Sequence, residues 1–218
     1  MEGAWSIVLA AGSGSRFGGN KQLAKLGDQR VVDWSVTRAR SCCEGVVLVV
    51  NAEMIGESEL PQVDIVVAGG PTRSESVRNG LEVLPQSAEI VVVHDAARPG
   101  APIQMYLSVI DAVLGGADAA VPGLPVTDTL KRVVDAPVGK KVAATVDRDT
   151  LMAIQTPQAF SKRMLEKAHA GGGQATDDAG LVEAIGGTVM VVPGDAAAIK
   201  ITHPSDISIV AQLMGLDS

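Results

Sequence analysis

Six short apolar runs divide this chain of 218 residues, and most are separated by segments with helical apolar spacing or helix-start signals. Because strands that alternate with helices are joined by right-handed crossovers, this order predicts a parallel sheet. The predicted strands are Trp5–Ala11, Gly45–Val50, Val63–Val67, Glu89–His94, Ala117–Val121 and Thr188–Val192. We therefore expect an α/β fold: a Rossmann-like, mostly parallel sheet with helices on both faces.

The composition agrees with this fold. Hydrophobic residues make up 46% of the chain but aromatic residues only 2%, which suits parallel strands under helices better than an aromatic-rich sandwich. The sequence Thr72-Arg73-Ser74-Glu75 is a capping box that predicts a helix start, and Pro204–Met214 is predicted as the last helix. Since no repeat or low-complexity linker is visible, we expect residues 1–218 to form a single domain.

One segment, residues 125–150, interrupts the alternation. Its halves, Asp128–Val134 and Lys140–Ala144, resemble two polar strands around a turn. A hairpin with so little core of its own usually packs on another surface. We expect a protruding β-hairpin arm that contacts a second copy of the chain, and a solvated insertion is the alternative.

A glycine-rich turn follows the first predicted strand. Leu9-Ala10-Ala11-Gly12-Ser13-Gly14-Ser15-Arg16 joins a buried strand to the next segment, and such turns expose backbone N–H groups to an anion. Arg16 and Lys21 add positive charge close to these donors. The loop therefore predicts a nucleotide site.

Two other interpretations of this loop stay open at the level of the residues. Gly12, Gly14 and Gly18 lie one residue off the dinucleotide fingerprint, which also needs an acidic residue about 20 positions later, at the end of the second strand. Asp33 has that spacing but lies in a helical pattern, and Glu53 comes too late. A plain strand-to-helix turn without a ligand is the other alternative.

Three loops should meet at the carboxyl edge of the predicted sheet, where ligands bind in open parallel sheets. These loops are Gly12–Arg16, Gly69–Pro71 and His94–Pro99. Asp95 follows a buried strand, so its carboxylate could take a Mg²⁺ water or a sugar hydroxyl, and an ion pair with Arg98 is equally compatible.

Two further groups of residues occur late in the chain. Arg148 and Thr156 put a guanidinium and a hydroxyl in irregular segments, a combination that commonly holds a phosphate monoester. Lys200 alternates with apolar neighbours, which by itself is typical of the solvent face of a strand.

Charge and length narrow the possible partners. A net charge of −7 argues against non-specific nucleic-acid binding. No run approaches the roughly 20 apolar residues that span a bilayer, and the first residues lack the basic start of a signal peptide. The adjacent Cys42 and Cys43 are expected to be reduced thiols. We therefore expect a cytoplasmic protein with no membrane partner.

Taken in order along the chain, these segments resemble the 2-C-methyl-D-erythritol 4-phosphate cytidylyltransferases of the non-mevalonate isoprenoid pathway. The resemblance covers nearly the whole chain. Its blocks are Leu9–Arg16 with Lys21, Gly69-Gly70 with Arg73 and Ser76-Val77, Val93–Pro99, Asp128–Lys131, Thr145–Arg148, Gln155–Gln158, Thr176–Ala179 and Ile199–Thr202.

The resemblance implies roles for individual residues. CTP binding is implied for Ala10, Ala11, Gly12, Gly14, Gly70, Pro71, Ser76, Asp95 and Ala96. Binding of the sugar-alcohol phosphate is implied for Asp95, Arg98, Thr129, Arg148, Thr156 and Lys200. Arg16, Lys21 and Lys200 are the implied catalytic cations. Mg²⁺ would be held mainly by the CTP phosphates with Asp95 as the candidate protein ligand, and the arm would clasp a second subunit in a homodimer.

The implied reaction is an in-line displacement at the α-phosphorus of CTP that needs no general base, so His94, His169 and His203 are interpreted as structural. The sequence departs from the family in the shortened stretch Phe17–Asn20 before Lys21. A ribitol 5-phosphate cytidylyltransferase shares most of these blocks and is the nearest alternative. An NAD-binding oxidoreductase and a noncatalytic nucleotide-binding module are the others.

Overall fold

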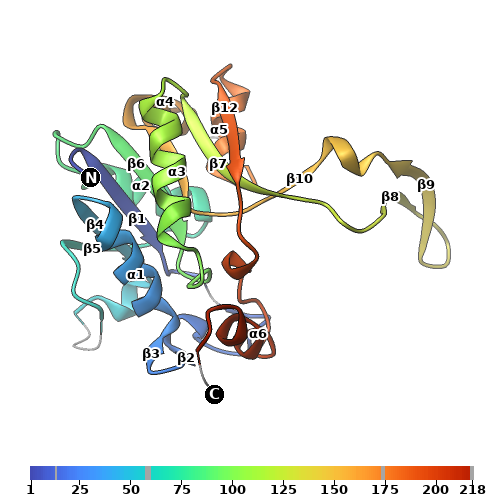
Figure 1. Cartoon of the computed structure of the whole chain (residues 1–218), viewed down its shortest axis with the longest axis horizontal. Helices are drawn as coiled ribbons and strands as arrows, with labels where there is room; N and C mark the ends of the chain where they lie inside the picture. The colour runs from blue at the N-terminus through green and yellow to red at the C-terminus, as the bar shows by residue number, and fades with distance from the viewer. Residues whose placement is uncertain (13, 57–59, 173–174, 217–218) are drawn as a thin grey trace.

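The computed structural model describes residues 1–12, 14–56, 60–172 and 175–216, and within these ranges eight strands form one sheet (Figure 1). The strands are β1 (Ala4–Leu9), β4 (Gly45–Val50), β5 (Ile65–Ala68), β6 (Ile90–Asp95), β7 (Ala119–Pro125), β10 (Met152–Ile154), β11 (Gln158–Ser161) and β12 (Val189–Pro193). Their order is β10-β7-β11-β6-β1-β4-β5, and β12 pairs with β7. The expected α/β sheet is therefore confirmed.

All six predicted strands are present, with ends shifted by a few residues, and Gly45–Val50 has the predicted bounds. Their apolar runs are continuous because the strands are buried on both faces. In β1, Ile7 packs into one hydrophobic cluster and Val8 into the other. The pairs β1–β4, β1–β6, β4–β5 and β12–β7 are parallel.

Helices cover both faces of the sheet, as predicted. They are α1 (Val31–Cys42), α2 (Arg73–Glu82), α3 (Ile103–Leu114), α4 (Lys162–Ala170), α5 (Asp178–Ala184) and α6 (Asp206–Leu213). The helices α1 and α3 pack on one face, while α2, α4 and α5 pack on the other. The predicted capping box opens α2, because Thr72 and Glu75 exchange side-chain and backbone hydrogen bonds. No helix of the described ranges is long and apolar enough to cross a membrane.

Strand β11 is the part of the sheet that simple alternation does not predict. It runs antiparallel between β6 and β7, so the central sheet is mixed rather than parallel throughout. The strand has only four residues, and Phe160 is its one large apolar side chain. A segment this short carries no clear period of its own, so its place depends on the neighbouring strands.

A third, smaller cluster joins the end of the chain to its beginning. It contains Leu26, Val31, Ile201 and Val210, from the ribbon of β2 (Lys25–Leu26) and β3 (Gln29–Arg30), from α1, from the segment before α6 and from α6 itself. The helix α6 begins at Asp206, and the Asp206 carboxylate closes the turn before it by accepting the N–H groups of Thr202 and His203. The predicted start at Pro204 was therefore early.

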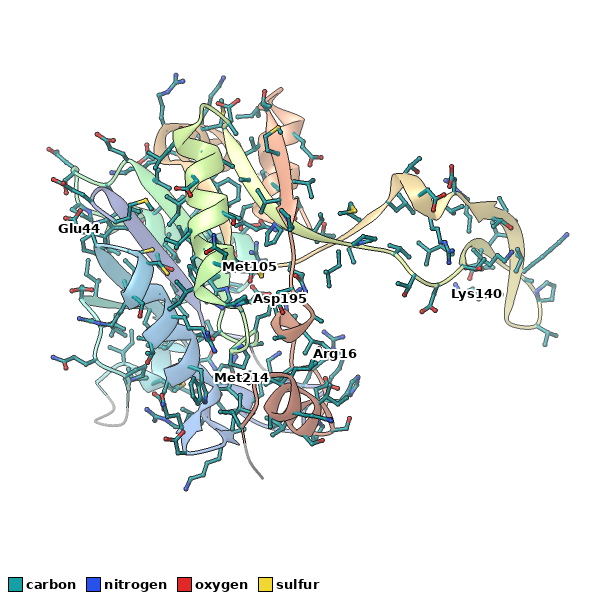
Figure 2. All side chains as sticks on the ribbon, in the orientation of Figure 1. Arg16, Glu44, Met105, Lys140, Asp195 and Met214 are labelled. Atoms are coloured by element: carbon teal, nitrogen blue, oxygen red, sulfur yellow. The ribbon has the colours of Figure 1, made fainter. Side chains whose placement is uncertain are left out.

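The predicted hairpin arm is present. The strands β8 (Leu130–Asp135) and β9 (Lys140–Val146) form a separate two-stranded antiparallel sheet that projects from the body (Figure 1). Figure 2 shows Lys140 on this arm, far from Arg16 on the body. Several apolar side chains of the arm are exposed, including Val133, Val134 and Val138.

Candidate active site

The carboxyl ends of β1, β5 and β6 meet at one edge of the sheet, as predicted, and a cavity of about 350 Å³ opens there. We name it the nucleotide cavity. The predicted site residues that line it are Ala11, Gly12, Lys21, Gly70, Pro71, Ser76, Asp95 and Lys200. The fold therefore brings together residues from both ends of the chain.

The loop after β1 makes a tight turn. Gly14 has φ of +61°, and its carbonyl accepts the N–H of Phe17 at 2.8 Å. A Cβ at position 14 would collide with the carbonyl oxygen of Gly19, so the turn requires glycine. Ser13 lies outside the described residues. The exposed Arg16 belongs to this turn and, like Gly14, does not line the cavity.

Lys21 lies in the wall of the nucleotide cavity despite the shortened stretch before it. Its Nζ donates to the carbonyl oxygen of Ile201 at 3.0 Å. Burial lowers the pKa of Lys21, and the positive charges of Lys200 and Arg16 lower it further, whereas Asp95 opposes this effect. Arg16 therefore adds to the positive charge around Lys21.

The opposite wall is formed by the loop after β5 and the first turn of α2. The N–H of Gly70 donates to Oγ of Ser76 at 3.1 Å, and Ser76 Oγ donates to the carbonyl oxygen of Thr72 at 3.0 Å. A Cβ at Gly70 would collide with the Cβ of Glu75. The absence of a side chain at Gly70 therefore allows this loop to pack closely on the first turn of α2.

Asp95 is the charged centre of the site. Its Oδ2 accepts from Lys200 Nζ at 2.6 Å, and its Oδ1 lies 3.6 Å from Nε of Arg73. Burial alone would raise the pKa of Asp95, but Lys200, Arg73 and Arg98 outweigh this and hold the pKa well below its usual range. Lys200 therefore does not occupy an ordinary solvent face. Arg98 is near, but its Nη1 donates to the carbonyl oxygen of Ala198 at 2.8 Å rather than to Asp95.

A second cavity of about 230 Å³ adjoins the first, and we name it the acceptor cavity. Arg73, Asp95 and Lys200 line both cavities, so they form the wall that the two share. Arg98 and Thr156 complete the predicted residues of the acceptor cavity. Two adjoining cavities with cations between them can hold two anionic ligands end to end.

The buried Thr156 is fixed by two neighbours. Its Oγ1 accepts the backbone N–H of Asp95 at 3.0 Å and lies 3.1 Å from Nδ1 of His94. His94 is fully buried, and this burial lowers the pKa of His94 to about 3. His94 is therefore neutral near pH 7 and supports Thr156, which agrees with its interpretation as structural.

This burial predicts how stability depends on pH. Between about pH 6.5 and pH 3 the unfolded chain binds a proton at His94 and the folded chain does not, so the free energy of unfolding should fall by about 1.4 kcal/mol per unit of decreasing pH. The lowered pKa of Asp95 adds to this loss only as the pH approaches the ordinary aspartate value of 3.8, so a measurement that stops at pH 4.5 reports mainly His94. Urea unfolding from pH 7 to pH 4.5 measures the slope. His94→Gln should make it shallower, while the exposed control His203→Gln should not; equal slopes would contradict the prediction.

Besides Gly14 and Arg16, four predicted residues do not line either cavity of this chain. Thr129 and Arg148 are exposed on the arm, where Arg148 donates to the carbonyl oxygen of Thr127. The side chains of Ala10 and Ala96 are buried in the core beneath α1 and α3. Only backbone groups at those two positions can face a ligand.

Several residues that line the cavities were not predicted as site residues from the sequence. Gln22 and Thr72 line the nucleotide cavity, Asp177 lines the acceptor cavity, and Arg73 lines both. Arg73 was noted only as part of a helix start and of a motif. Its position after a strand end, at the first turn of a helix and in a loop expected at the ligand edge, is the signal that could have identified it.

Comparisons with known proteins identify the family of this chain. A sequence profile of the 2-C-methyl-D-erythritol 4-phosphate cytidylyltransferase family matches residues 5–215. A protein of that name from Streptomyces coelicolor is 41% identical over 93% of this chain and 81% of its own length. A bifunctional IspD/IspF enzyme from Solidesulfovibrio magneticus is 40% identical over 95% of this chain, which spans about half of that relative, 56% of its length.

The fold is shared as well. The crystal structure of 2-C-methyl-D-erythritol 4-phosphate cytidylyltransferase from Thermus thermophilus superposes with a TM-score of 0.80 and 32% sequence identity, covering 98% of each chain. The sequence comparisons and the structural comparison therefore identify the same enzyme family. The chain belongs to the 2-C-methyl-D-erythritol 4-phosphate cytidylyltransferase family.

Proposed function

We propose that this protein joins CTP and 2-C-methyl-D-erythritol 4-phosphate, giving 4-diphosphocytidyl-2-C-methyl-D-erythritol and pyrophosphate. The observation that carries the proposal is the pair of adjoining cavities whose common wall consists of Arg73, Asp95 and Lys200. A transfer between two phosphorylated molecules requires two sites that meet where the phosphates react. The cations of this wall stand at that meeting point.

In this proposal the larger cavity binds CTP. Lys21 and Lys200 supply positive charge for the triphosphate, and Arg16, which lies outside the cavity, adds to the positive charge around Lys21. Gly70 and Ser76 are the candidates for contact with cytosine, because their mutual hydrogen bond fixes a backbone edge and a hydroxyl in the opposite wall.

The acceptor cavity would bind the sugar-alcohol phosphate. Asp95 can accept a hydrogen bond from a hydroxyl of the ligand, while Arg98 and Lys200 can bind its phosphate. Thr156 is held with its side chain committed to His94 and to the backbone of Asp95, so it keeps the Asp95 region in place. This division gives each cavity one of the two substrates.

The chemistry follows from charge. An oxygen of the sugar phosphate forms a bond to the α-phosphorus of CTP, and the bond from that phosphorus to the β-phosphate oxygen breaks, so that pyrophosphate leaves. The nucleophile is anionic near neutral pH because its second pKa is about 6, and no general base is needed. The protein aligns two polyanions and neutralises their repulsion with Lys21, Lys200, Arg73 and Arg98.

A divalent cation is part of this proposal. No cluster of three or more His, Cys, Asp and Glu side chains that could hold a metal occurs among the described residues. Mg²⁺ typically keeps several waters and is held by substrate phosphates with one or two carboxylates. The donor set therefore fits an ion that arrives with the triphosphate and uses Asp95 as its protein ligand. Such an ion adds charge neutralisation at the phosphates.

Lys21→Ala is expected to lower turnover about 10²-fold, because the variant lacks one of the cations facing the triphosphate. Stability should change little, since the main contact of Lys21 is one hydrogen bond to a carbonyl oxygen. Steady-state rates and the urea midpoint measure the two effects. Near-normal turnover would remove Lys21 from the catalytic set.

The arm is proposed to complete the active site of a partner subunit in a homodimer. Thr129 and Arg148 lie on the arm, outside both cavities of their own chain. The exposed valines of the arm, such as Val138 at 93% exposure, are apolar surface that a second subunit would cover. Light scattering should therefore give the mass of a dimer.

Mixing two inactive variants tests the contribution of the arm. If Arg148 acts on the partner's site, a heterodimer of Arg148→Ala and Lys200→Ala chains has one intact site, and a statistical mixture should regain about one quarter of wild-type activity. Each variant alone stays inactive. A mixture no more active than its components would show that the arm does not act in trans.

Pyrophosphate release is the direct test of the proposed function. CTP with 2-C-methyl-D-erythritol 4-phosphate should release pyrophosphate, whereas ATP or UTP in place of CTP should not. Ribitol 5-phosphate in a parallel reaction separates the two acceptors. Equal rates with ATP would contradict the cytosine assignment, and no release with either acceptor would contradict the reaction class.

The proposed location is the cytoplasm. Cys42 and Cys43 are free and buried, and burial raises the pKa of Cys43 to about 12. Unreactive thiols of this kind suit a reducing compartment.

A further inference from the structure

A buried carboxylate lies directly behind the shared wall of the two cavities. Asp178, the first residue of α5, has a side chain with 0% exposure and lines neither cavity. Its Oδ2 accepts from Arg73 Nη1 at 2.7 Å, and its Oδ1 lies 3.0 Å from Nε2 of His169. A buried charge is retained only where its partners hold it, so these contacts are tightly constrained.

Arg73 connects this carboxylate to the site. One end of its guanidinium contacts Asp178, and its Nε lies 3.6 Å from Oδ1 of Asp95. Burial by itself would lower the pKa of Arg73, but Asp178 and Asp95 outweigh this and raise it, so Arg73 stays charged. A continuous chain of ionic contacts therefore runs from Asp178 through Arg73 and Asp95 to Lys200.

The distances in this series of ionic contacts are unequal. Lys200 approaches Asp95 to 2.6 Å and Arg73 approaches Asp178 to 2.7 Å, but Arg73 and Asp95 stay 3.6 Å apart. The guanidinium is thus hydrogen-bonded to the buried carboxylate and only ion-paired with the one that lines the cavities. Oδ1 of Asp95 therefore keeps its capacity to accept a hydrogen bond from a ligand.

We propose that Asp178 is a positioning residue for the transfer reaction: it draws Arg73 away from Asp95 and so keeps the Asp95 carboxylate open to the acceptor substrate. Without the negative charge at position 178, Asp95 is the nearest anionic partner of Arg73. The guanidinium then closes on Asp95 and occupies Oδ1. This inference rests on the proposed function, because it assigns Asp95 to the sugar-alcohol phosphate.

The central variant is Asp178→Asn, which removes the charge and keeps the shape. We expect it to raise KM for 2-C-methyl-D-erythritol 4-phosphate about tenfold and to change KM for CTP less than about threefold. In an Arg73→Gln background the same substitution should have no further effect on KM, since Asp178 acts through Arg73. Equal factors in the two backgrounds, or an unchanged KM in Asp178→Asn, would overturn the proposal.

Two further variants separate positioning from stability. His169→Gln alters the other contact of Asp178, so it should lower the urea midpoint and leave KM within about twofold of wild type. Arg73→Lys keeps the charge, but one ammonium group cannot span both carboxylates, so KM for the acceptor should rise. If Asp178→Asn does not fold, Arg73→Lys still tests the proposal. A wild-type KM for the acceptor in Arg73→Lys would contradict it.

An NMR measurement tests the positioning without turnover. The Nε–H signal of Arg73, assigned from its loss in Arg73→Lys, should shift in Asp178→Asn and stay in place in His169→Gln. If wild-type protein releases no pyrophosphate, the proposed function fails and this signal still decides whether Asp178 positions Arg73. An unshifted signal in folded Asp178→Asn contradicts the inference.

Discussion

Lys200→Ala is expected to lower turnover about 10³-fold, because Lys200 is a cation in the wall that both cavities share. Its Nζ also holds Oδ2 of Asp95 at 2.6 Å. The alanine variant therefore loses positive charge at the reacting phosphates. It also leaves the negative charge of Asp95 less neutralised, and this charge repels both substrates. Single-turnover measurement of pyrophosphate release reports the loss directly.

Two variants serve as controls for this prediction. Lys167→Ala removes an exposed lysine on α4, outside both cavities, and should have wild-type turnover. Lys200→Arg keeps the charge in a larger, planar group and should retain part of the activity. The urea midpoint of Lys200→Ala should fall, because the nearly buried Asp95 carboxylate loses its hydrogen-bonded partner, so turnover is compared in buffer without urea, where both proteins are folded. Turnover within about threefold of wild type would show that Lys200 is not catalytic.

Phe160→Ala is expected to lower the free energy of unfolding by about 3–5 kcal/mol. Phe160 lies in β11 with 0% exposure, in the cluster beneath α2, α4 and α5. Its removal opens a cavity where an antiparallel strand joins the two halves of the sheet, and the neighbouring strands cannot close that space. Equilibrium urea unfolding measures the difference.

The matched control for Phe160→Ala is Val138→Ala. Val138 is apolar but 93% exposed at the arm, so its truncation in the isolated chain should cost less than about 0.5 kcal/mol. A loss below about 1 kcal/mol for Phe160→Ala would mean that β11 does not bind the sheet together as the packing indicates.

The strands of the sheet were predictable where burial on both faces requires a continuous run of apolar residues. The run Gly45–Val50 is apolar throughout because both faces of β4 are covered, and the strand has the predicted bounds. The run 158–161 has one large apolar residue, so β11 and its antiparallel direction were missed. The starts of α2 and α6 were predictable because each has a local contact: Glu75 accepts the N–H of Thr72 and Asp206 accepts the N–H of His203, and both predicted starts lie within two residues of the observed ones.

The sequence predicted which loops form the site, but it predicted less well which side chains of those loops line the cavities. The three loops meet as expected because parallel strands share one carboxyl edge. Membership of a cytidylyltransferase family also makes the oxidoreductase alternative wrong. The placement of Ala10 and Ala96 in the core was not foreseen, because one-residue alternation decides which side chain faces the sheet. The roles predicted for the individual site residues stay predictions that the variants above test.

The sequence by itself determined the α/β class, the glycine-rich loop after β1, the order of the motifs and the hairpin at residues 125–150, because each depends on residues close together in the chain. Only the tertiary structure decided that Arg73, Asp95 and Lys200 form one wall and that Asp178 stands behind it. The contacts between Asp95 and Lys200 and between Arg73 and Asp178 each join residues 105 positions apart. Such contacts depend on sheet order and helix placement, and no local pattern specifies them.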